Sequence, residues 1–116
     1  MALAAGQPDR ITNNFNVFEV SGPITQSGSY TAGGDTLDLS GLGVPSNSVP
    51  DLVQIIEQPP SGTVASGYDF AYAKGTTQAN GKVQAFSSGG TQLGAVTYAS
   101  VNIANLRYFA RFLKFQ

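Results

Sequence analysis

The stretch Gly67-Tyr-Asp-Phe-Ala-Tyr-Ala-Lys74, followed after a short loop by Lys82-Val-Gln-Ala-Phe86, is the clearest local pattern in this sequence. Its aromatic residues alternate with small or polar ones, which is the period of a β-strand with one apolar face. Asn80-Gly81, just before the second run, suits a tight hairpin turn because both residues tolerate positive φ. The two runs are therefore predicted to pair as antiparallel strands.

The rest of the chain repeats this alternation of short β-rich runs and breaks. Fourteen Gly and six Pro interrupt 116 residues, at a spacing typical of an all-β sandwich or barrel. That length fits one domain with one core. We predict a small antiparallel β-sandwich or jelly-roll-like barrel over residues 11–116. Residues 1–10 lack apolar periodicity and are predicted to form a flexible N-terminal arm.

Three other segments are predicted as strands. Phe15-Asn-Val-Phe-Glu-Val20 indicates a strand closed by Ser21-Gly-Pro23, because Gly and Pro commonly mark a turn. Asp51-Leu-Val-Gln-Ile-Ile-Glu57 is dense in apolar and β-branched residues and favours a strand, although a short helix also fits. In Thr36–Ser40, the two leucines point to one side and the polar residues to the other.

The last segment, Asn105-Leu-Arg-Tyr-Phe-Ala-Arg-Phe-Leu-Lys-Phe115, fits a strand or a helix. A helix would place its three cations on one stripe. Aromatic density and the all-β context favour a strand. The strand would have one face of Leu106, Tyr108, Ala110 and Phe112, and another of Arg107, Phe109, Arg111, Leu113 and Phe115.

The stretch Ala32-Gly-Gly-Asp-Thr-Leu-Asp-Leu-Ser-Gly41 contains the candidate carboxylates. It superficially resembles a calcium-binding β-roll repeat, but such repeats must stack to complete their ligand sets, and it occurs once. Asp35 and Asp38 would lie on opposite faces of a strand, so they could not converge on one glycosidic bond. The favoured interpretation is a Gly33-Gly34 turn followed by a strand, with Asp35 at the strand entry and Asp38 on the polar side, where they discourage edge pairing.

Composition excludes several function classes. The formal net charge is −1 and only 11% of residues are charged, which disfavours binding to nucleic acid. The chain has no Cys and no His, so thiolate, zinc-thiolate and imidazole chemistry are excluded. No apolar run is long enough to span a membrane, and no signal peptide is evident. We expect no catalytic residues, metal or cofactor, and synthesis in a cytosol.

The aromatic face of Tyr68, Phe70 and Tyr72 has two interpretations. Aromatic rings dominate cores and interfaces, and the favoured interpretation is packing of this kind. The alternative is a platform for stacking on sugar rings, with Tyr68 and Tyr72 as the contacts of a carbohydrate-binding module.

Two strings and the terminal segment resemble short virion proteins of tailed bacteriophages. The strings are Ser27-Gly-Ser-Tyr-Thr-Ala-Gly-Gly-Asp-Thr-Leu-Asp-Leu39, and Gly67-Tyr-Asp-Phe-Ala-Tyr with Asn80-Gly-Lys-Val-Gln-Ala-Phe86. The terminal segment is Arg107-Tyr-Phe-Ala-Arg-Phe112. The similarity runs from about residue 20 onward, and its motifs are structural rather than chemical.

The resemblance implies a β-sandwich that decorates or cements a capsid and has no catalytic residues. Its expected partners are the major capsid protein and further copies of itself, and its expected location is the virion surface. Low charge and abundant short polar residues agree with a surface that is partly covered in an assembly.

Overall fold

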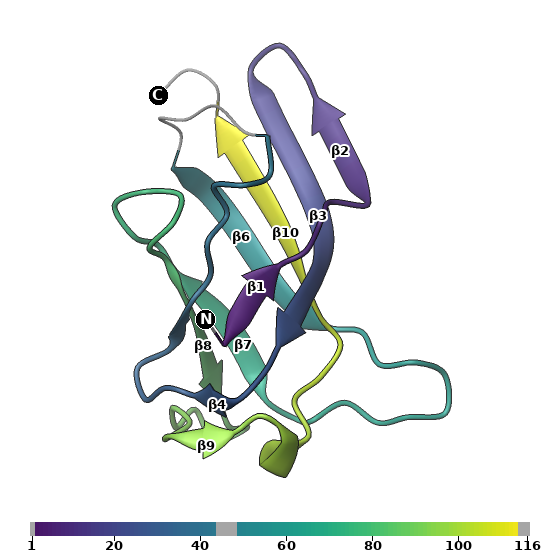
Figure 1. Ribbon diagram of the computed structural model, residues 1–116, viewed down its shortest axis with the longest axis vertical. Coiled ribbons are helices and arrows are strands. Elements are labelled where there is room, and N and C mark those ends of the chain that lie inside the picture. Colours follow the sequence, from purple (N-terminus) through teal and green to yellow (C-terminus); the bar gives the residue numbers. More distant parts are fainter. Residues whose placement is uncertain (1, 44–48, 114–116) are drawn as a thin grey trace.

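The computed structural model describes residues 2–43 and 49–113, which form antiparallel strands with one short 3-10 turn (Figure 1). The all-β prediction is therefore confirmed. The elements are β1 Leu3–Ala5, β2 Arg10–Asn13, β3 Val17–Gln26, β4 Ser29–Tyr30, β5 Asp35–Thr36, β6 Pro50–Glu57, β7 Asp69–Ala73, β8 Lys82–Phe86, β9 Val96–Thr97, η1 Ala99–Val101 and β10 Leu106–Leu113.

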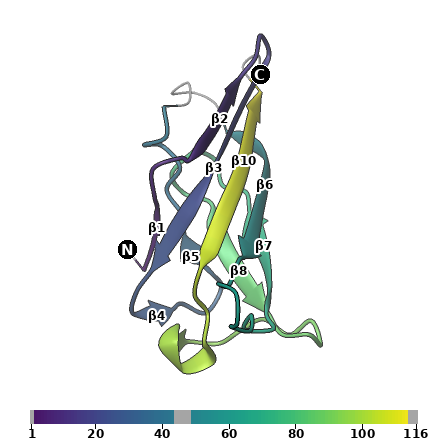
Figure 2. The same ribbon diagram turned by 90° about the vertical axis from the view of Figure 1, so that its right-hand side faces the viewer.

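The strands form a sandwich of two main sheets. The larger sheet has the order β1-β3-β10-β6, and β2 also pairs with β3 on the edge that β1 occupies. Figure 2 shows β2, β3, β10 and β6 side by side. The smaller sheet has the order β5-β8-β7, and β4 pairs with β9 apart from both. The predicted antiparallel sandwich therefore describes the chain.

The core lies on the inner face of the larger sheet. Leu106, Tyr108, Ala110 and Phe112 are all buried, and the alternate residues of β10 lie on the outer face. The strand interpretation of this segment is confirmed, because the period is two and β10 pairs with β3 and β6 along its length. Phe115 lies outside the described residues.

The hairpin of β7 and β8 forms as predicted, with Ala73 opposite Lys82. The predicted tight turn at Asn80-Gly81 is wrong, because neither residue has positive φ. Gly81 is required for a different reason. A Cβ at this position would lie 2.0 Å from the Tyr72 hydroxyl oxygen, so the glycine leaves space for that ring.

Strand β3 continues through Gly22-Pro23, where the sequence predicted a turn. A Cβ at Gly22 would lie 2.7 Å from the Tyr108 hydroxyl oxygen and 3.0 Å from the Gln7 carbonyl oxygen, so only glycine fits. The carbonyl of Pro23 accepts a hydrogen bond from Gly6 N–H at 2.8 Å. The missing N–H of Pro23 faces the same edge, where the chain between β1 and β2 leaves the regular ladder.

The prediction of a flexible arm at residues 1–10 is wrong for the part of it that the structure describes. Residues Leu3–Ala5 form β1 on the edge of β3, and the Leu3 side chain is fully buried in the core. The Tyr108 hydroxyl donates a hydrogen bond of 2.9 Å to the Gly6 carbonyl. Arg10 already belongs to β2, so the domain begins before residue 11. A single buried leucine forms no periodic pattern, so nothing in the sequence indicated that this segment is a strand.

We predict that Leu3→Ala lowers the free energy of unfolding by about 2–5 kcal/mol, as for other buried leucines. Val64, which is 90% exposed, provides the control: Val64→Ala should change it by less than about 0.5 kcal/mol. Urea unfolding of both variants measures the difference. Equal stabilities would mean that β1 does not hold the fold.

Candidate functional site

The stretch from Gly33 to Ser40 combines a turn with buried leucines. Gly33 and Gly34 have φ of 96° and 110°, values that L side chains rarely adopt, and the predicted glycine turn is therefore confirmed. Leu37 and Leu39 are fully buried, as predicted. The regular strand β5 is shorter than predicted and covers only Asp35–Thr36.

The two carboxylates of this stretch lie in different environments. Asp35 begins β5, as predicted for the strand entry, and it is only 6% exposed. Asp38 is partly exposed and accepts hydrogen bonds from the N–H and the hydroxyl of Ser40, at 2.8 and 2.5 Å. The pair therefore does not converge on one substrate position. Within residues 2–43 and 49–113, no three acidic side chains gather where they could hold a metal ion.

Asp35 is held by groups from distant segments. Its carboxylate accepts one hydrogen bond from the Tyr98 hydroxyl and a second, of 3.2 Å, from the N–H of Thr31. Tyr30 packs edge-on against Tyr98, with ring centroids 6.1 Å apart, and its hydroxyl accepts a hydrogen bond of 3.0 Å from Ala85 N–H. The pairing of β4 with β9 brings the two tyrosines together.

Burial is the main cause that raises the pKa of Tyr98, and the hydrogen bond to Asp35 and its charge raise it further. The phenol is therefore held as a proton donor to Asp35 rather than ionised. Neither Asp35 nor Tyr30 is open to solvent. The hydrogen bonds of Asp35, Tyr30 and Tyr98 hold β4, β5, β8 and β9 together. The buried groups of this cluster are not accessible to a substrate.

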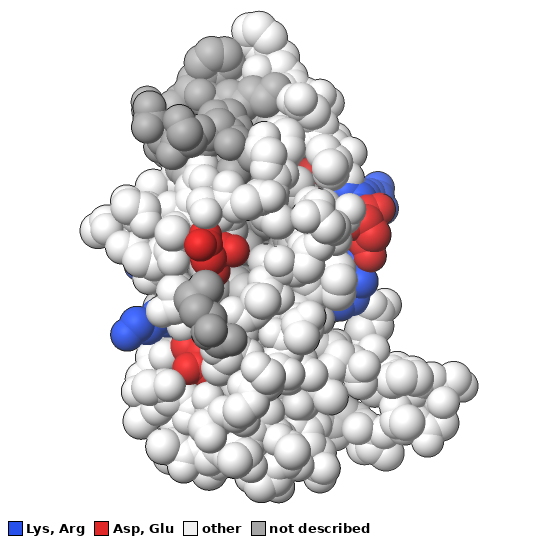
Figure 3. Space-filling model, viewed as in Figure 1, with Lys and Arg blue, Asp and Glu red and all other residues white. Residues whose placement is uncertain are grey.

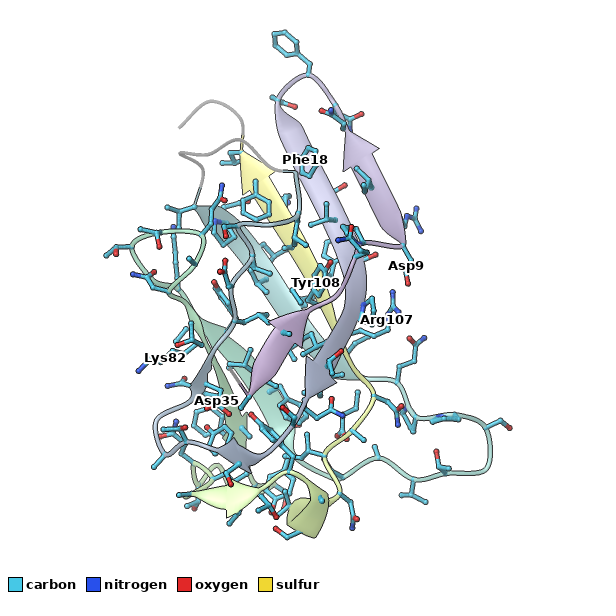
Figure 4. All side chains as sticks on the ribbon, viewed as in Figure 1. Asp9, Phe18, Asp35, Lys82, Arg107 and Tyr108 are labelled. Carbon is cyan, nitrogen blue, oxygen red and sulfur yellow. The ribbon has the colours of Figure 1, made fainter. Side chains whose placement is uncertain are left out.

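Burial also raises the pKa of Tyr108 to about 12, with a further contribution from the charge of Asp9. Figure 4 shows Tyr108 toward the interior, whereas Asp9 and Arg107 face each other at the rim of the sheet. Tyr108 is thus a second buried phenol whose hydroxyl is hydrogen-bonded within the fold, in this case to the backbone after β1.

The predicted aromatic face is not an open platform. Tyr68, Phe70 and Tyr72 are all partly buried and pack against the core cluster. Burial, followed by the charge of Asp38, raises the pKa of Tyr72. The favoured interpretation of these rings as packing residues is confirmed.

The outer face of the larger sheet contains the second face that was predicted for β10, and its apolar side chains are partly exposed. Phe109 and Leu113 are 36% and 37% exposed, and the neighbouring strand β6 adds Leu52 and Ile56, at 40% and 53%. Shallow grooves of about 220 and 250 Å³ flank the Phe109 ring. The sequence pattern found the β10 side of this surface but gave no sign of its continuation across β6.

Ion pairs border this face. Arg107 Nη2 lies 2.7 Å from Asp9, and Arg111 Nη2 lies 2.7 Å from Asp51. The hydrogen bond from Arg111 lowers the pKa of Asp51 and raises that of Arg111. Both pairs are partly exposed, so each contributes little to stability. Their main effect is to neutralise the two arginines within the chain.

The chain matches no protein-family model, no curated protein and no solved structure at a significant level. The resemblance to phage virion proteins therefore stays a prediction. No helix in the described part of the chain is long and apolar enough to cross a membrane.

The brace around Asp35 is testable by a double-mutant cycle. Tyr98→Phe and Asp35→Ala should each lower the free energy of unfolding by about 1–3 kcal/mol, because each leaves a buried polar partner unsatisfied. The double variant should lose less than the sum, with a coupling of about 1 kcal/mol.

Asp69, an exposed carboxylate on β7, is the control, and Asp69→Ala should stay within about 0.5 kcal/mol of the parent. Additive losses in urea unfolding of the Asp35 and Tyr98 variants would show that the two side chains do not act as a unit.

Proposed function

We propose that this chain is a non-enzymatic structural virion protein that binds the surface of a bacteriophage capsid and stabilises it. Its partner is the major capsid protein, and its place is the virion surface. The observation that supports this most directly is that two segments project from the sandwich and end on exposed apolar side chains (Figure 1).

One projecting segment is the loop between β6 and β7. Val64 in this loop is 90% exposed. Thr63 donates hydrogen bonds to the Pro60 carbonyl from its N–H and its hydroxyl, at 3.1 and 2.7 Å. At the base of the loop, Glu57 accepts hydrogen bonds from the N–H and the hydroxyl of Ser66, at 3.1 and 2.6 Å. The loop is preorganised, so ordering costs on binding are small.

The other projecting segment is the turn between β2 and β3, where Phe15 is 86% exposed. Burial of one such side chain contributes about 1.5–3 kcal/mol, which is too little for tight binding of a single copy. A capsid repeats the same contact many times, so weak contacts gain strength when several are made together.

The sparse charge of the surface also supports binding to protein. The chain has 6 basic and 7 acidic residues among 116. On the face seen in Figure 3, charged side chains are few and scattered, and they form no extended patch of one sign. Such a surface has few cations to pair with the phosphates of a nucleic acid. The alternative, a carbohydrate-binding module, has less support because Tyr68 and Tyr72 pack against the core.

The proposal predicts that the purified protein co-sediments with capsids that lack it. Val64→Asp should weaken this attachment at least about tenfold, because a charge would be buried where an apolar contact forms. Ala95→Asp, which places the same charge in another exposed loop, is the matched control and should bind like the parent.

Absence of co-sedimentation of the parent protein, together with specific binding on a glycan array, would favour the carbohydrate-binding alternative. If the Val64 and Ala95 variants lose capsid binding equally, then an added negative charge anywhere on the surface weakens attachment, and the Val64 loop has no special role.

A further inference from the structure

The outer face of the larger sheet presents exposed apolar side chains that no described strand covers. They come from the two neighbouring strands β6 and β10, and they are Leu52, Ile56, Phe109 and Leu113. Polar residues lie between them, since Phe109 is opposite Gln54 and diagonal to Leu52 and Ile56. Apolar side chains that gather on an exposed face can mark an interaction site.

The charges of this face cancel within the chain. Among residues 2–43 and 49–113, three arginines lie on or beside it, and three carboxylates match them: they are Arg10, Arg107 and Arg111, with Asp9, Glu19 and Asp51. The formal charges of these six residues cancel. A partner of strong charge of either sign would find no complementary excess here. A second copy of the same face meets it without net like-charge repulsion.

The shape of the face allows contact between two copies. Phe109 lies near the middle of β10 and stands between two grooves. The groove lined by Ser21, Gln54, Ile56 and Arg107 has about 250 Å³, whereas a cavity of about 150 Å³ accommodates a benzene ring. In a two-fold arrangement, the Phe109 ring of each copy can therefore enter this groove of the other.

The size of the face limits the partner it can bind. Eight residues of β10, at about 3.3 Å each, span about 26 Å, and β3, β10 and β6 together span about 14 Å in width, to which the four residues of β2 add a shorter strand. The flat area is about 440 Å², and standing side chains increase the accessible area. A specific interface commonly buries about 600–1,000 Å² on each partner. A dimer is therefore possible only if the whole face is covered.

We propose that two copies of this chain associate face to face through the outer surface of β2, β3, β10 and β6, with Phe109 at the centre. This inference does not depend on capsid binding. If the protein also binds a capsid, each dimer would present two Val64 loops and could make two linked contacts.

Sedimentation velocity over a dilution series tests the proposal. The parent protein should change from dimer to monomer on dilution. Phe109→Glu should weaken dimerisation at least about a hundredfold, because it places two carboxylates at a desolvated centre. Phe109→Ser adds no charge and should weaken it at least about tenfold. Melting temperature and circular dichroism verify that both variants remain folded.

The matched control is Ala95→Asp, which adds a charge at an exposed residue beside β9, a strand outside the larger sheet, and should dimerise like the parent. Because the ion pairs lie within one chain, raising the salt concentration should change dimerisation by less than about threefold. A parent protein that stays monomeric at the highest soluble concentration overturns the proposal. So does a dimer that both Phe109 variants leave intact.

Discussion

The structure depends on the insertion of β10 between β3 and β6. This strand pairs with β3 from Leu106 to Leu113 and with β6 from Leu106 to Phe112. Its inward side chains are among the most buried in the described chain. Burial of each large apolar side chain contributes about 1.5–3 kcal/mol. Without β10, strand β6 would no longer be hydrogen-bonded to β3 and the strands beside it. The smaller sheet would also lose the surface against which it packs.

The hydroxyl of Tyr108 connects the same strand to the start of the chain. It crosses β3 at Gly22, where no side chain blocks it, and bonds the Gly6 carbonyl at 2.9 Å. At the other end of the sandwich, the hydroxyl of Tyr98 donates a hydrogen bond to Asp35. The buried polar groups of these two sites thus hold backbone segments together. The exterior of the larger sheet and the projecting loops carry exposed apolar side chains instead.

Sequence patterns predicted the features that depend on local period. The alternation in β10, the pairing of β7 with β8 and the glycine turn before Leu37 all follow from neighbouring residues. The features that sequence missed depend on contacts between distant segments. Asp35 is buried because Tyr98, 63 residues away, completes its hydrogen bonds. Gly22-Pro23 resembles a turn in sequence, and it stays in a strand because Tyr108 and Gly6 pack there. No local pattern contains that information.

Native-state amide hydrogen exchange tests most directly whether β10 holds both the sheet and the start of the chain. We predict that the N–H of Gly6, bonded to the Pro23 carbonyl at 2.8 Å, exchanges with the same opening free energy as the amides of β10. In the Tyr108→Phe variant, the N–H of Gly6 should exchange first while β10 stays protected. Rapid exchange at Gly6 in the parent protein, with β10 fully protected, would contradict this central role of β10, because the start of the chain would then open independently of the strand.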